Sequence, residues 1–190
     1  MAALLGAMLQ GSLVSISVFV LTLLFSLPLA LPLAFGRMSL NRFISGPVKL
    51  YLLVMRGTPL ILQLIFVYFA PYYIFRASWD RYTAVIVAFS INYAAYFAEI
   101  YRGGIESIPK GQYEAAKVLG FTRRQTFFRI VLPQVVKRIL PSTANEVITL
   151  VKDTALAQTI GVAELFRVAQ NASCANSPPR PSSSRASSTS

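Results

Sequence analysis

The side chains best suited to chemistry in this sequence lie in a largely apolar segment, from about residue 139 to residue 163. They are Asn145, Glu146, Lys152, Asp153 and Thr154. Ionisable groups at membrane depth are costly unless they pair or face water, so by default they mark a pathway for polar molecules. Lys152 and Asp153 are adjacent and point about 100° apart on a helix, so they cannot be assumed to neutralise each other. The open alternative is a position near the end of a membrane span, where long side chains reach the interface.

Several other kinds of chemistry are excluded by the composition. The chain has no histidine and a single cysteine, Cys174, which rules out a disulfide within the chain and any histidine-based metal or acid/base site. It also has no G-x-x-x-x-G-K-[ST] pattern, the loop that cradles nucleotide phosphates. We therefore predict no catalytic residue, no metal site and no cofactor, and we interpret Cys174 as an inert residue in a loose segment.

The elements that hold these residues are predicted to be membrane helices. The 190 residues are 55% hydrophobic and 13% charged, with a mean hydropathy of +0.57, whereas soluble domains carry roughly 25% charged residues. A helix needs about 20 apolar residues to cross the hydrocarbon core. Four segments are candidates, at about 11–35, 58–75, 82–98 and 139–163, so we predict an all-α, multi-span bundle. Prolines inside these segments predict broken helices, which either line a polar pathway or reflect the ordinary frequency of proline in membrane helices.

The net charge of +11 is concentrated in two places. One basic group, Arg37 to Arg56, follows the first apolar segment, and the other, Arg102 to Arg138, follows the third. Both would lie on one side of the membrane, and an excess of Lys and Arg in short loops marks the cytoplasmic side. Topology therefore explains the charge better than nucleic-acid binding. The same reasoning places the N-terminus outside.

A polar, basic stretch from Glu114 to Gln134 interrupts the apolar segments. We expect a short helix after Pro109, with Glu114 in its early turns, where the helix dipole favours a carboxylate by about 0.3–1 kcal/mol. Ala115 and Ala116 are small and would allow a partner to approach closely. An ordinary amphipathic cytoplasmic loop would have much the same composition, so this alternative stays open.

The predicted ends of the two helices in this stretch follow local rules. Gly120 is expected to end the first helix in a left-handed conformation. Thr122 and Gln125 have the spacing of a capping box for the second helix. We expect Pro133 to end that second helix shortly before the last apolar segment.

The sequence also resembles a known family. Glu114-Ala115-Ala116, then Gly120, then Ile130-Val131-Leu132-Pro133 look like the EAA signature of the membrane subunits of ATP-binding-cassette importers, matched over twenty positions without a gap. Three stretches, "RGTPLILQLIFVYF", "AAYFAEIYRGGIESIPKGQYEAA" and "LVKDTALAQTIGVAEL", resemble the polar amino-acid permeases of the histidine, glutamine and arginine type. The resemblance covers about residues 11–171.

This resemblance implies a non-catalytic permease subunit in the bacterial inner membrane. The EAA segment would be a coupling helix that docks on a separate ATPase, with Glu114, Ala115, Ala116, Gly120, Ile130, Leu132 and Pro133 as its site residues. The implied partners are ATPase subunits, a second permease subunit, an extracytoplasmic amino-acid-binding protein and membrane lipid. Similar sequences also suggest that Asn92 and Glu99 face the bundle interior, either on the substrate pathway or as interhelical hydrogen bonds that aid packing.

The sequence departs from this family at its C-terminal end. The family normally has five spans and a last helix where this chain continues, after Asn171, with "ASCANSPPRPSSSRASSTS". We expect residues 172–190 to be disordered and hypothesise a truncated or frameshifted permease. Two rival functions remain: a permease for another small polar solute, and a non-transporting membrane protein whose basic loop recruits lipid or a soluble partner.

Overall fold

The computed structural model describes residues 2–76 and 80–156. The helices are α1 (Ala2–Met38), α2 (Arg42–Gly57), α3 (Leu60–Phe75), α4 (Arg81–Glu106), α5 (Lys110–Val118), α6 (Arg123–Gln125) and α7 (Leu132–Asp153). A π-helical turn, Thr126–Val131, joins α6 to α7, and a 3-10 turn, Thr154–Leu156, follows α7. The described part of the chain contains no strand, so the prediction of an all-α fold is confirmed. The region expected to be disordered, 172–190, and Cys174 lie outside the described residues.

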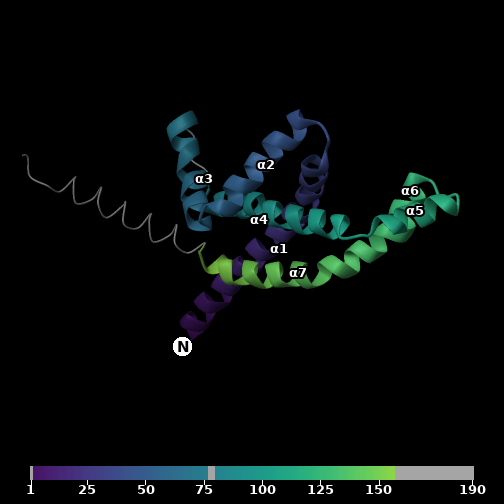
Figure 1. The fold of residues 1–190 in the computed structure, drawn as a ribbon. Coiled ribbons are helices and arrows are strands. Elements are labelled where there is room, and N and C mark those ends of the chain that lie inside the picture. The colour runs from purple at the N-terminus through teal and green to yellow at the C-terminus, as the bar shows by residue number, and fades with distance from the viewer. Residues whose placement is uncertain (1, 77–79, 157–190) are drawn as a thin grey trace, which may run out of the picture.

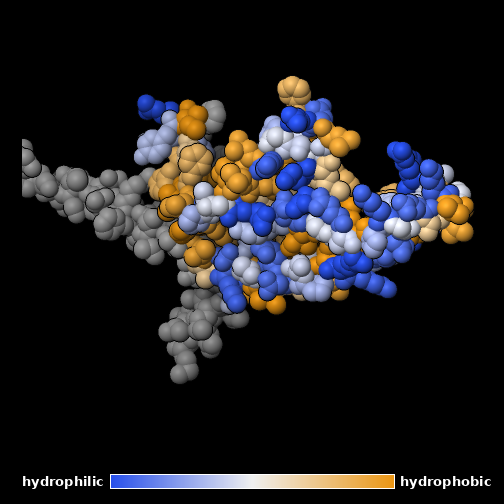
Figure 2. Space-filling model, in the orientation of Figure 1, coloured by the Kyte–Doolittle hydropathy of each residue, from blue (hydrophilic) through white to orange (hydrophobic). Residues whose placement is uncertain are grey.

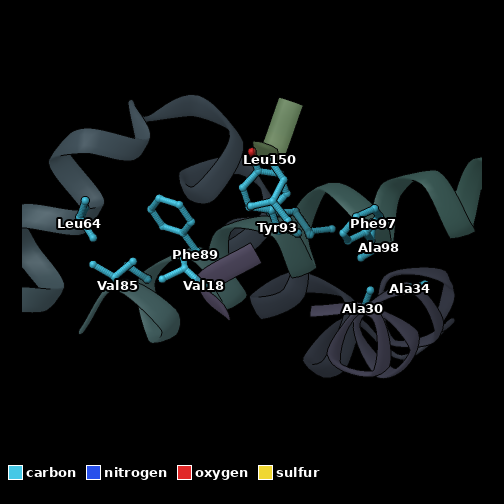
Figure 3. Close-up of a cluster of buried hydrophobic side chains, with 13 residues drawn as sticks. Val18, Ala30, Ala34, Leu64, Val85, Phe89, Tyr93, Phe97, Ala98 and Leu150 are labelled. Carbon is cyan, nitrogen blue, oxygen red and sulfur yellow. The ribbon is translucent and has the colours of Figure 1, made fainter. Parts of the chain in front are cut away.

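Helix α4 is the centre of the bundle (Figure 1). It packs most extensively on α1 and also contacts α2, α3 and α7. Its buried face alternates small and aromatic residues, with Phe89, Tyr93 and Phe97 almost fully enclosed. These rings belong to one apolar cluster with Val18 and Ala30 of α1, Leu64 of α3 and Leu150 of α7, drawn in Figure 3.

The outer surface of α1 is apolar and exposed. Leu13, Ile16, Val20 and Leu24 are each more than half exposed, and the helix has no charged residue before Arg37. In water such a stripe would promote association, whereas in a bilayer it faces acyl chains of equal polarity. The exposed apolar face of α1 therefore fits the membrane span that its length and composition allow.

The number of membrane spans differs in part from the prediction. By length and composition, α1 (residues 12–38) and α4 can each cross a membrane, as predicted. Helices α2 and α3 pass only as a pair bent by 111°, so the predicted second span is part of a broken element. Helix α7 does not pass, because its 22 residues include five charged ones, and the rest of the predicted fourth span, residues 157–163, lies outside the described residues.

The segment between Arg37 and Arg56, expected to be a basic loop, is the amphipathic helix α2. The Asn41 side chain caps it by accepting a hydrogen bond from the Phe43 backbone N–H at 3.0 Å. Its apolar side chains at Val48, Leu52 and Met55 join the core. The prediction was wrong because the charges stand seven residues apart, at 42, 49 and 56, and so share one side of the helix.

Pro133 does not end a helix, contrary to the prediction. It is the second residue of α7, which continues directly from the π-helical turn. There the Leu132 N–H donates to the Phe127 carbonyl, five residues earlier. A proline ring normally clashes with the carbonyl four residues before it, and the wider turn accommodates the ring. The chain therefore runs from the basic stretch into α7 without a flexible joint.

Gly104 sets the spacing between α4 and α7, and this predicts a steric effect. A Cβ atom at this position would lie 2.2 Å from Cγ2 of Ile139. Overpacking of this kind costs about 1–3 kcal/mol, so we expect Gly104→Ala to lower the melting temperature of the detergent-purified protein. Gly103→Ala is the matched control, since nothing lies within 4 Å of its added Cβ. Ile139→Ala should restore stability to Gly104→Ala; failure to do so would contradict the steric explanation.

Candidate functional site

Two cavities lie along α4 and α7. The larger, of about 870 Å³, is lined by residues of α2, α4 and α7: Arg56, Tyr96, Glu99, Ile100, Gly103, Gly104, Ser107, Arg138, Ile139, Pro141, Ser142, Asn145 and Glu146. The smaller, of about 180 Å³, is lined by Thr58, Leu60, Asn92, Tyr93, Tyr96, Glu146, Thr149 and Asp153. Tyr96 and Glu146 line both, so the two cavities share a wall. Figure 2 shows hydrophilic side chains gathered over α4 on this side of the molecule.

The two acidic residues predicted for α7 line the small cavity. Asp153 accepts a hydrogen bond from the Tyr93 hydroxyl at 2.7 Å, and this bond fixes its carboxylate against the core. Glu146 is half-buried. The cavity therefore presents two carboxylates, and none of its other lining residues is charged.

The other predicted pathway residues of α7 have different positions. Asn145 is exposed and lines the large cavity. Lys152 is exposed and lines neither cavity. Thr154 is buried, and its hydroxyl donates to the Val151 carbonyl at 2.7 Å. The structure therefore brings together Glu146 and Asp153 but not Lys152 or Thr154.

Asn92 ties α4 to the break between α2 and α3. Its side-chain amide donates to the Met55 carbonyl at 3.1 Å and to Oε1 of Gln63 at 2.8 Å. Gln63 in turn donates to the carbonyls of Met55 and Thr58. A helix end in an apolar environment must have its carbonyls satisfied, and these two amides do so. The packing role considered for Asn92 is therefore present, although the residue also lines the small cavity.

Glu99 is the centre of an ionic cluster at the edge of the large cavity. Arg102 donates to it twice, from Nη2 at 2.7 Å and from Nε at 3.2 Å. Arg37 of α1 and Arg56 of α2 approach the same carboxylate at 3.9 Å and 3.7 Å. The Glu99 side chain is 17% exposed, so one largely buried carboxylate links three helices.

Arg56 is the residue of this site that sequence reasoning missed. Its guanidinium stacks over the Tyr96 ring at 5.6 Å and lines the large cavity. The available signal was its position directly before Gly57-Thr58-Pro59, a sequence that ends a helix. It was instead counted only among the charges that set topology.

The EAA segment forms the rigid turn that local rules predict. Gly120 has φ of +77°. Its N–H donates to the Lys117 carbonyl, and the Phe121 N–H donates to the Ala116 carbonyl, both at 3.0 Å, which is the Schellman pattern. Thr122 and Gln125 form the predicted capping box. Glu114, however, is the fifth residue of α5 rather than part of its first turn, so the expected dipole effect does not apply.

The two alanines of the EAA segment differ in burial. Ala115 and Glu114 are exposed, whereas Ala116 is fully buried. Helix α5 packs on the π-helical turn, and the buried alanine allows this approach. Ala116 therefore has a packing contact within the chain, whereas Ala115 and Glu114 are open to a partner.

The second half of the segment anchors it to the bundle. Ile130 and Leu132 are half-buried and Pro133 is exposed. Val131 and Val135 form a small apolar cluster with Ile108. In addition, Arg138 of α7 donates to the Ser107 carbonyl between α4 and α5. The segment is thus attached to both α4 and α7.

The end of this segment at α5 and α6 (Figure 1) exposes apolar side chains among hydrophilic ones (Figure 2). Val118 is 87% exposed and Leu119 is 73% exposed. The exposed arginines Arg123 and Arg124 follow after three residues. Large exposed apolar residues ringed by polar ones mark an interaction surface.

Within residues 2–76 and 80–156, no group of three or more His, Cys, Asp and Glu side chains is placed to hold a metal ion. The fold and site instead define a class of membrane protein. It is a helical membrane protein with a polar, charged cavity between α2, α4 and α7 and a rigid basic element that projects from one end of the bundle.

The chain belongs to the family described as the binding-protein-dependent transport system inner membrane component, which matches residues 26–176. Members of this family with such apolar helices are multi-pass inner-membrane proteins. The chain is 41% identical to the L-cystine transport system permease protein TcyB of Bacillus subtilis (strain 168), over 85% of this chain and 69% of that protein. It is 37% identical to the putative glutamine transport system permease protein GlnP of Rickettsia conorii, over 85% and 74% of the two chains.

Solved structures show the same fold. The chain matches the crystal structure of an amino acid ABC transporter with histidines, with a TM-score of 0.71 and 34% identity over 86% of this chain and 79% of that one. A methionine ABC transporter in an inward-facing conformation matches with a TM-score of 0.59 and 22% identity, over 78% of this chain and 69% of that one. The first match, together with the family, places the chain among the permease folds of importers, as the sequence predicted, and the second shows the same fold.

Proposed function

We propose that the chain is the transmembrane permease subunit of an ATP-binding-cassette importer that moves polar amino acids into the cytoplasm. The observation that carries this proposal is the pair of adjoining cavities, which present both carboxylates, including Glu146 and Asp153, and arginine side chains, including Arg56. A zwitterionic amino acid needs partners of both charge signs there. The names of the two relatives refer to L-cystine and glutamine. Both compounds carry the α-ammonium and α-carboxylate groups that such a cavity would hold.

We further propose that ATP hydrolysis takes place on a separate chain and reaches the cavity through the EAA segment. Glu114, Ala115, Gly120 and the exposed tip at Val118 and Leu119 would contact the ATPase. Ile130, Leu132 and Pro133 would connect that contact to α7, which lines both cavities. A rigid element attached to α4 and α7 can transmit a displacement that a flexible loop would absorb.

The remaining features of the proposal follow from this topology. The transport domain would span about residues 11–171, with the N-terminus outside and the EAA segment in the cytoplasm. The polar face of α4 and α7 would be covered by a second permease subunit. An extracytoplasmic binding protein would deliver the amino acid.

An uptake assay tests the proposal directly. The complex with its ATPase and binding protein is reconstituted in liposomes and offered the twenty common amino acids and L-cystine, each radiolabelled. Asp153→Asn should reduce uptake of the transported amino acid at least about tenfold, the order expected for loss of a charge-assisted hydrogen bond, while the ATPase stays bound. Lys152→Gln, at the adjacent exposed position, should leave uptake unchanged. No ATP-dependent uptake of any amino acid would reject the proposal.

A further inference from the structure

The Arg56 guanidinium differs from the other charged groups of the large cavity in its hydrogen bonding. The cations that line the large cavity are Arg56 and Arg138, and its anions are Glu99 and Glu146. Arg138 donates to the Ser107 carbonyl, and both Glu99 oxygens lie beside arginines. Arg56, by contrast, donates no hydrogen bond to any residue in the described part of the chain. Its 3.7 Å approach to Glu99 is an ion pair beyond hydrogen-bond length.

The backbone around Arg56 is fixed even though its guanidinium is not hydrogen-bonded. The preceding carbonyl, that of Met55, accepts hydrogen bonds from both Gln63 and Asn92. The side chain is then directed over the Tyr96 ring, and it remains 45% exposed. The guanidinium is therefore held in the large cavity against Tyr96, a residue that lines both cavities, and its N–H donors are available to a ligand.

An arginine in this state is suited to bind a carboxylate. Its planar guanidinium presents paired N–H donors that match the two oxygens of a carboxylate, and it keeps its charge at any physiological pH. Within the Glu99 cluster, the three arginines Arg37, Arg56 and Arg102 exceed the two carboxylates Glu99 and Glu106 by one positive charge. Glu146 also lines this cavity, so a zwitterion, which brings one charge of each sign, would leave the overall charge balance unchanged.

We infer that Arg56 binds the α-carboxylate of the amino acid in the cavity, exchanging its loose pairing with Glu99 for that of the substrate. This inference rests on the proposed function. Glu146, which lines the same cavity, is the carboxylate available for the α-ammonium group. Arg56 thus determines specificity for amino acids as a class, because it binds a group common to all of them. The neighbouring side chains select among individual amino acids.

Binding to the detergent-purified permease–ATPase complex, without the binding protein, tests the inference. The probes are the radiolabelled amino acid found in the uptake screen and its unlabelled α-amide, which lacks the carboxylate. Wild type should prefer the amino acid at least about tenfold over the amide. Arg56→Gln should weaken amino-acid binding about 10- to 100-fold and remove that preference. Arg56→Lys keeps the charge but not the paired donors. Its affinity for the amino acid should lie between those of wild type and Arg56→Gln.

Arg37→Gln is the matched control. Arg37 is also a distant partner of Glu99, at 3.9 Å, but it does not line either cavity, so binding should change less than about twofold. An equal loss in Arg37→Gln and Arg56→Gln would overturn the inference, because it would assign the effect to the cluster alone. So would an amino acid that is taken up but shows no saturable binding, or no preference over its amide. If wild type takes up no amino acid at all, the proposed function itself fails.

Discussion

Glu99→Gln should destabilise the protein more than any other single substitution considered for this chain. The change keeps the shape of the side chain but removes the charge that faces Arg37, Arg56 and Arg102. Removing one partner of a buried ion pair costs about 3–5 kcal/mol, and the partial exposure of the arginines places the expected loss toward the lower end. A large drop in the melting temperature and yield of the detergent-purified protein is the expected result.

Two further variants separate the cluster from a general effect of lost charge. Glu106 accepts from the same Arg102 but is 49% exposed, and exposed pairs contribute about 0–1 kcal/mol, so Glu106→Gln should be nearly neutral. Arg37→Gln combined with Glu99→Gln should recover part of the lost stability, because it removes one of the repelling charges. A double variant less stable than Glu99→Gln alone would argue against repulsion as the cause.

Local sequence rules were sufficient for the turn of the EAA segment. The left-handed Gly120 and the Thr122–Gln125 capping box each depend on residues within a few positions of one another. The same is true of the helix start after Pro109. Features of this kind were predicted correctly because the backbone groups they satisfy lie in the same stretch of chain.

Features that depend on distant packing were not predictable in this way. Ala116 is buried because α5 folds back on the π-helical turn, and nothing in the EAA pattern distinguishes it from Ala115. The role of Arg56 depends on a helix break that Gln63 and Asn92 stabilise from two other helices. Periodicity assigns such residues to a face of a helix, but their partners are known only once the helices are packed.

Gly120→Val should abolish capture of the ATPase by the permease. Gly120 has φ of +77°, where a β-branched residue is strained by about 1–3 kcal/mol. The helix end would relax by breaking the two hydrogen bonds of the Schellman turn, and the exposed Val118 and Leu119 would lose their fixed orientation. We expect at least about tenfold less ATPase to co-purify with the tagged variant, because the proposed docking would depend on this preorganisation.

The conformational explanation can be separated from a simple loss of space at the docking surface. No atom lies within 4 Å of a Cβ added at Gly120 or at Gly111 of α5, so Gly120→Ala and Gly111→Ala add the same methyl group without a clash. Only Gly120→Ala strains the backbone, so only Gly120→Ala should weaken capture of the ATPase. Gly120→Asn adds a larger side chain that tolerates the left-handed region, so it should retain most of the captured ATPase. Glu114→Lys instead leaves the turn intact and reverses one exposed charge of the EAA segment. If capture survives both Gly120→Val and Glu114→Lys unchanged, the EAA segment does not couple this chain to an ATPase.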